Sequence, residues 1–144
     1  MTAIAQPVRT GLRAPVTWGL VVGVAQAATP LGFWWLDTAT VYALGLVGIA
    51  FVYVGFAVAD GRRTVLAVET TVAGVFVVIA AAAVTGTPWL LVAGLAGHGL
   101  KDLWQHRTQF VANTRWWPPF CLVVDFAVAA IIAVEIVAGA PFHD

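Results

Sequence analysis

PPFCLVVDFAVAAIIAVEIVAGA, residues 118–140, is a run of apolar side chains interrupted by only two charged residues, Asp125 and Glu135. A helix needs about 20 consecutive apolar residues to cross the hydrocarbon core of a bilayer. The run therefore predicts a membrane-spanning helix. Its double proline suits the first helical turn, where the missing N–H would have no helical partner anyway.

Four further apolar segments of similar length precede this run, at residues 16–36, 40–59, 64–85 and 88–105. Composition agrees with a membrane protein, because 61% of the residues are hydrophobic and only 10% are charged, whereas soluble domains carry about 25% charged residues. The sequence predicts an all-α integral membrane bundle of five transmembrane helices, in a single domain over residues 1–144. Pro30 lies well inside the first segment and should kink it or end its regular part.

The distribution of basic residues predicts the orientation. With five spans, the N-terminus and the links at residues 60–63 and 106–117 share one side of the membrane. All seven basic residues fall on or near that side: Arg9, Arg13, Arg62, Arg63, Lys101, Arg107 and Arg115. The positive-inside rule makes this side cytoplasmic. We therefore expect an N-in, C-out, multi-pass protein of the cell (inner) membrane.

The first segment also has an alternative interpretation. Two arginines, an apolar run and Ala25-Gln26-Ala27 fit a cleavable signal peptide. Apolar character resumes as far as Leu36, however, which favours an uncleaved span.

Five ionisable residues lie inside or at the edge of the apolar segments: Glu69, His98, Asp102, His106 and Asp125. A charge at the centre of a membrane helix costs about 2.5–3.5 kcal/mol on insertion scales, so such residues mark functional sites. The two histidines and Asp102 follow an i, i+4, i+8 spacing that lines one helix face. Gly94 extends this stripe and is expected to leave open space. The three carboxylates are predicted to lie at similar depth in the cytoplasmic leaflet.

This polar layer indicates proton-transfer chemistry. Asp102 beside His98 or His106 could fix the imidazole tautomer, leaving the other ring nitrogen as a general acid or base. Asp125 or Glu69 would act as the opposite partner. We expect a small membrane enzyme of isomerase, cyclase or hydrolase type that acts on a lipophilic or lipid-linked substrate.

Arg107, Arg115 and Asn113 are expected to bind the head group of that substrate at the inner surface. The predicted partners are membrane lipids and a lipophilic small molecule, with a homo-oligomer or larger membrane complex as a further possibility. Zero net charge argues against nucleic acid. No cofactor is predicted, although a metal ion held by His98, Asp102 and Asp125 would be chemically reasonable.

Two other classes of function remain open. Acidic and histidine residues inside membranes also mark proton and ion pathways, so a proton-coupled or small-solute transporter is one alternative. A structural or accessory subunit is the other, because buried charges can simply neutralise one another. In that case Lys101 would snorkel and pair with Asp102 or with lipid phosphates.

The stretch His98-Gly99-x-x-Asp102-x-x-x-His106-Arg107, with RWWPPFCxxxD at residues 115–125, resembles a family of small polytopic membrane proteins without a settled activity. In the family pattern a Trp commonly precedes the Asp and a second His precedes the His-Arg pair. Lys101 and Gln105 stand there in this chain, which disfavours a mechanism using two adjacent histidines. The resemblance implies one site that contains His98, Asp102, His106, Arg115 and Asp125, and it implies no reaction.

Overall fold

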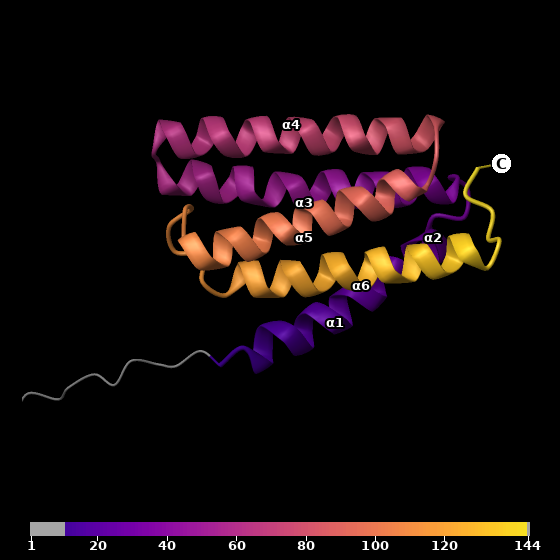
Figure 1. The fold of residues 1–144 in the computed structure, drawn as a ribbon, viewed down its shortest axis with the longest axis horizontal. Coiled ribbons are helices and arrows are strands. Elements are labelled where there is room, and N and C mark those ends of the chain that lie inside the picture. Colours follow the sequence, from indigo (N-terminus) through magenta and orange to yellow (C-terminus); the bar gives the residue numbers. More distant parts are fainter. Residues whose placement is uncertain (1–10, 144) are drawn as a thin grey trace, which may run out of the picture.

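The computed structural model describes residues 11–143, and this part of the chain is helical with no strand. The helices are α1 (Arg13–Ala27), α2 (Thr29–Gly32), α3 (Thr38–Asp60), α4 (Arg63–Thr85), α5 (Trp89–Thr108) and α6 (Trp117–Val137). Figure 1 shows α3, α4, α5 and α6 running along the length of one elongated bundle. Their bounds agree closely with the four later predicted segments, and the fold is all-α as expected.

The first predicted segment, 16–36, is not one continuous helix. Helix α1 ends at Ala27, and the single turn of α2 follows with Pro30 in its first turn. Proline lacks an N–H and clashes with the preceding turn of a helix, so the break lies where Pro30 predicts it. At 15 residues, α1 extends only about 22 Å, which is shorter than the core of a bilayer.

Three helices of the described chain, α3, α4 and α6, are long and apolar enough to cross a membrane. Helix α5 has sufficient length at 20 residues, but it carries the polar residues His98, Lys101 and Asp102. Large apolar side chains cover much of the outer surface, including Leu44, Val78 and Val134, each at least 60% exposed. Such a surface is typical of a protein that meets lipid, because soluble monomers rarely expose large apolar patches.

Basic residues gather at one end of the bundle, which we call the basic end. The start of α1, the α3–α4 turn and the α5–α6 link all lie there, whereas α2, the α4–α5 turn and the C-terminal segment lie at the other end (Figure 1). The described arginines of the basic end are Arg13, Arg62, Arg63, Arg107 and Arg115. Arg9 lies outside the described residues, and Lys101 lies within α5.

The links at the basic end are tied together through Asp60. Its carboxylate accepts hydrogen bonds from Arg62 Nε at 2.6 Å and from the Ala112 N–H at 2.8 Å. The guanidinium of Arg62 also donates to the Phe110 carbonyl at 2.7 Å. Its hydrogen bonds to Asp60 raise the pKa of Arg62 above its ordinary value. The α3–α4 turn thereby fixes the position of the α5–α6 link.

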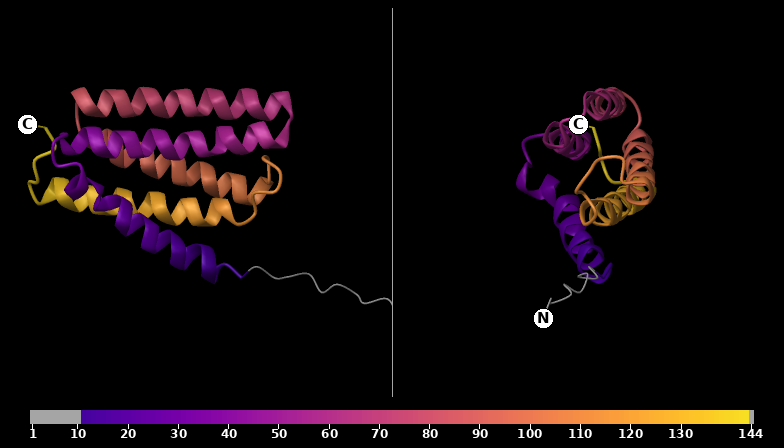
Figure 2. Two further views of the ribbon diagram at one scale, coloured as in Figure 1. Left: turned by 180° about the vertical axis from the view of Figure 1, so that it is seen from behind. Right: turned by 90° about the vertical axis from the view of Figure 1, so that its left-hand side faces the viewer.

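The bundle is built from two helical hairpins. Helix α3 packs closely on α4, and α5 packs closely on α6, whereas contacts between the two hairpins are less extensive. We call the boundary between them the seam. Helix α1 lies on the outside of α6, as the two views of Figure 2 show.

Two glycines allow α1 to approach α6. A Cβ atom at Gly19 would lie 2.8 Å from the Phe120 carbonyl oxygen, and one at Gly23 would lie 3.0 Å from Ala127 Cβ. Small residues four apart let membrane helices pack with their backbones close together. Gly19-x-x-x-Gly23 is therefore the contact motif between α1 and α6.

Replacing this glycine with a large residue should loosen α1. We expect Gly19→Leu to lower the free energy of unfolding by about 1–3 kcal/mol, because the new side chain cannot fit against α6. Gly48→Leu is the matched control, since a Cβ atom at Gly48 meets no atom within 4 Å. Thermal unfolding in detergent, together with limited proteolysis near residue 28, would measure the effect. Equal stability of the two variants would contradict the contact.

Candidate acid/base site

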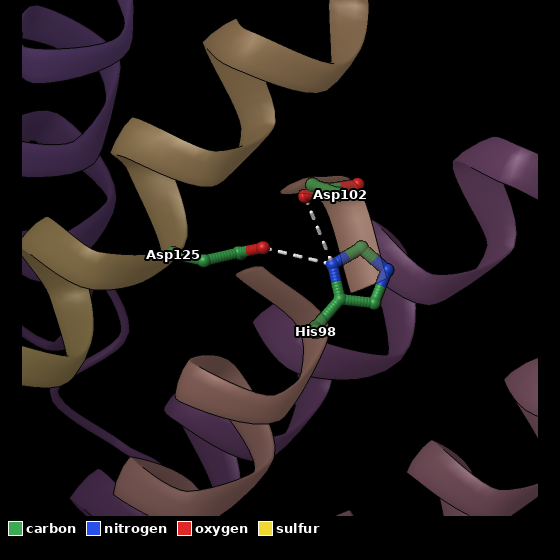
Figure 3. A group of neighbouring side chains, drawn as sticks. All are labelled: His98, Asp102 and Asp125. Carbon is green, nitrogen blue, oxygen red and sulfur yellow. Dashed lines mark hydrogen bonds and ion pairs between the residues drawn. The ribbon is translucent and has the colours of Figure 1, made fainter. Parts of the chain in front are cut away.

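One imidazole nitrogen faces two carboxylates in the interior of the bundle. His98 Nδ1 lies 2.8 Å from Asp125 Oδ2, a hydrogen bond, and 3.4 Å from Asp102 Oδ2. His98 and Asp102 are one turn apart on α5, and Asp125 comes from α6 (Figure 3). No more than 1% of any of the three residues is exposed. We call these three residues the His98 group.

Gly99 allows the two helices of this group to meet. A Cβ atom at Gly99 would lie 2.8 Å from the ring of Phe126 and 3.4 Å from Asp125 Cβ. A larger residue would push α5 away from α6. The glycine beside His98 therefore brings the carboxylate of Asp125 within hydrogen-bonding distance of the imidazole.

Aromatic rings from the other hairpin pack against His98. The ring of Phe76 on α4 lies edge-on with centroids 5.0 Å apart, and that of Tyr53 on α3 lies at 6.0 Å. Figure 3 shows the second ring nitrogen, Nε2, pointing away from both carboxylates. The imidazole is thus held at Nδ1, with Nε2 directed away from the groups that hold it.

Several buried oxygen atoms around His98 have no hydrogen-bond partner among the described residues. They are both carboxylate oxygens of Asp102, Asp125 Oδ1 and the Tyr53 hydroxyl oxygen. A buried polar atom without a partner costs about 1–3 kcal/mol. These oxygens can therefore accept a proton, accept a hydrogen bond from a substrate, or bind a cation.

The His98 group also fits the ligand set of a metal ion. One ligand atom from each of its three residues lies within 4.8 Å of the others. Metal–ligand bonds of about 2.0–2.2 Å place neighbouring ligand atoms about 2.9–3.5 Å apart. The 2.8 Å and 3.4 Å separations at Nδ1 are close to that range. One imidazole and two carboxylates suit a divalent transition metal.

Glu69 pairs with Lys101 and makes no hydrogen bond to a member of the His98 group. Its Oε2 accepts a hydrogen bond from Lys101 Nζ at 2.5 Å, and the same ammonium lies 3.4 Å from the centre of the Tyr53 ring. The accessory-subunit alternative paired Lys101 with Asp102 or lipid phosphates, whereas the structure pairs it with Glu69. This ion pair joins α4 to α5 across the seam and neutralises Glu69.

His106 and Arg115 are also separate from the His98 group. They line a cavity of about 270 Å³ at the basic end. His106 follows His98 by eight residues, about 12 Å along α5. Arg107 and Asn113 are exposed and do not line this cavity. The single site implied by the sequence pattern is thus divided between two places.

The space expected beside Gly94 is filled. A Cβ atom there would lie 2.7 Å from Leu46 and 3.1 Å from Ile79. The helix-face pattern correctly placed Gly94 toward the interior, but it could not show that side chains from α3 and α4 occupy the gap. That prediction was wrong.

Sequence reasoning missed three residues that shape this region. Tyr53 and Phe76 contact His98. They lie in ordinary apolar segments, so nothing in the sequence distinguished them from residues that face lipid or the core. Gln105, fully buried, donates to the Val111 carbonyl and the Thr114 hydroxyl. Its position in the polar helix α5 could have indicated a buried polar role, which is to hold the α5–α6 link in place.

Comparisons with models of known families, with characterised proteins and with solved structures find no match.

Proposed function

We propose that this protein is a small integral membrane enzyme that uses His98 for acid/base catalysis on a lipophilic substrate. The observation that carries the proposal is the His98–Asp125 hydrogen bond of 2.8 Å, with Nε2 pointing away from both carboxylates. When Nδ1–H donates to a carboxylate, Nε2 is free to take up or give a proton. Asp125 orients the ring, and Asp102 supports the positive charge that forms on it.

The aromatic surroundings of the His98 ring support a lipophilic substrate. The rings of Phe76 and Tyr53 form an apolar, aromatic wall against the imidazole. Because His98 is 1% exposed, substrate would have to enter by local separation of the two hairpins at the seam. Opening of this kind is common in enzymes that exclude water from the reacting groups.

The topology that supports this function has five spans. Helices α3, α4 and α6 are each apolar enough to span the membrane. Helix α5 would span it when packed against these helices, and α1 together with α2 would form the first span. The basic end would then face the cytoplasm and place the His98 group in the cytoplasmic leaflet of the inner membrane. Membrane lipids are the first partners, and the substrate would arrive from that leaflet.

The apolar core favours a one-sided site over a pathway through the bundle. Between the His98 group and Glu135 near the opposite end, buried apolar side chains fill the interior, namely Leu46, Leu91, Leu95, Val128 and Ile132. Glu135 itself accepts a hydrogen bond from the Tyr42 hydroxyl at 3.0 Å. A transport pathway would need polar groups where these residues pack.

Metal-dependent catalysis at the same residues is the second candidate. It is favoured by the spacing of the three ligand atoms and by the unpartnered oxygens of Asp102. Elemental analysis of the purified protein separates the two candidates. About one divalent ion per chain, lost in Asp125→Asn, would support the metal site. Absence of metal together with retained activity would support acid/base catalysis by the imidazole alone.

Isotope transfer tests the proposed reaction on a mixture of lipids. Proteoliposomes made from a total lipid extract would be incubated in ²H₂¹⁸O and the lipids analysed by mass spectrometry. Isomerisation or cyclisation places deuterium on carbon, and hydrolysis places ¹⁸O in a product. We expect His98→Gln to slow labelling by about 100-fold or more, the size of a general acid/base contribution.

The exposed His143 supplies the matched control. His143→Gln should label lipids at the wild-type rate, and Asp125→Asn should show an intermediate loss because the amide can still bond to the ring but supplies no negative charge to stabilise the protonated imidazole. Correct folding of each variant would be checked by thermal unfolding. Labelling by His98→Gln at the wild-type rate would refute the proposal.

A further inference from the structure

The cavity at the basic end is a second candidate site, distinct from the His98 group. Its volume is about 270 Å³. It lies between the start of α1, the end of α5 and the start of α6, and its lining residues are Leu12, Pro15, His106, Gln109, Arg115, Trp116 and Pro119.

The polar part of the lining is cationic. Arg115 contributes an exposed guanidinium that makes no ion pair with any described residue. His106 Nδ1 is buried and has no hydrogen-bond partner within the described part of the chain. The lining contains no Asp or Glu. Charge and unused hydrogen-bonding capacity therefore both favour an anion.

The helix ends around the cavity are compatible with an anion. Helix α1 begins beside it, and no side chain of residues 11–143 caps its first N–H groups, so within this part of the chain the positive end of its dipole is available. Two carbonyl groups near the end of α5 are occupied. Gln109 donates its N–H to the Gln105 carbonyl at 2.8 Å and its side-chain amide to the His106 carbonyl at 2.9 Å.

The rest of the lining is apolar and comes from Leu12, Pro15, Trp116 and Pro119. The volume is below the range of about 300–1,000 Å³ that is typical of sites for complete drug-sized ligands. A compact anion attached to an apolar chain fits both the size and the mixed lining. We propose that this cavity binds the phosphate group of a phosphorylated amphiphile, with Arg115 and His106 as the charged and hydrogen-bonding contacts.

Binding would be measured by calorimetry on the full chain in a neutral detergent. The probes are dihexanoyl phosphatidic acid, inorganic phosphate and dihexanoyl phosphatidylcholine, whose zwitterionic head group has no net charge and shields its phosphate with choline. We expect Arg115→Gln and His106→Gln each to weaken phosphatidic acid binding about tenfold or more, the loss of one hydrogen bond to a charged group. Arg115→Lys, which keeps the charge, should bind more tightly than Arg115→Gln.

Arg63→Gln is the matched control, because Arg63 is exposed at the same end and does not line the cavity. It should bind as the wild type does. Tight binding of phosphatidic acid alone would identify a lipid as the source of the phosphate, and equal binding of inorganic phosphate would identify free phosphate.

Two results would overturn the proposal. One is no binding of either phosphate probe to folded wild-type protein. The other is an equal loss in Arg63→Gln and Arg115→Gln, which would show only general attraction to the basic end. Because no turnover is measured, the result does not depend on the reaction proposed for His98.

Discussion

Lys101→Met should be among the most destabilising substitutions in this protein. It removes the counter-ion of Glu69, which is only 1% exposed and accepts its hydrogen bond from Lys101. Breaking a buried ion pair by removing one partner costs about 3–5 kcal/mol, because the other charge is left uncompensated. Unfolding followed by tryptophan fluorescence, in a detergent mixture of increasing SDS content, would measure the loss.

A double variant separates the missing charge from the missing side chain. We expect Glu69→Gln in the Lys101→Met background to recover most of the stability, because no charge then remains unpaired at the seam. Arg107→Met provides a surface comparison and should change stability little, since exposed charges contribute weakly. If Lys101→Met unfolds like Arg107→Met, the ion pair across the seam does not stabilise the bundle.

His98→Leu should have an effect of similar size for a different reason. Without the imidazole, the carboxylates of Asp102 and Asp125 face one another in the interior with no hydrogen-bond donor between them. We expect a loss of about 3–5 kcal/mol, the cost of leaving buried charge uncompensated. The same unfolding assay in detergent would measure it.

Replacing the two aspartates tests whether charge or lost packing destabilises His98→Leu. Adding Asp102→Asn and Asp125→Asn to His98→Leu should restore stability, because the repulsion between the carboxylates is removed. The exposed His143 again serves as a control, through His143→Leu. A triple variant as unstable as His98→Leu would show that lost packing against Phe76 and Tyr53, and not charge, causes the defect.

The helices themselves could be predicted from the sequence because a helix that crosses a membrane needs a long run of apolar residues. Long apolar runs mark α3, α4 and α6, and the i, i+4 spacing on α5 placed His98 and Asp102 on one face. Pro30 correctly marked the interruption after α1. These features depend on residues close together along the chain, so periodicity and composition detect them.

The grouping of the polar residues could not be predicted, because it depends on how helices rotate and pack. Similar depth suggested that Glu69 would join Asp102 and Asp125. In the structure, Glu69 pairs with Lys101, and Asp125 forms a hydrogen bond with His98. The second pairing depends on the close approach of α5 and α6 at Gly99. Depth alone does not determine which side of a helix meets which neighbour.

The Glu69–Lys101 bridge also has a consequence for how the protein assembles. In the proposed topology, a hairpin that inserts into the bilayer before its partner leaves one charge unpaired: the carboxylate of Glu69 in the α3–α4 hairpin, or the ammonium of Lys101 in the α5–α6 hairpin. Only association of the hairpins removes both costs and encloses His98 between Tyr53 and Phe76. We therefore expect the acid/base site to form in the last step of biogenesis, after all the helices are in the membrane.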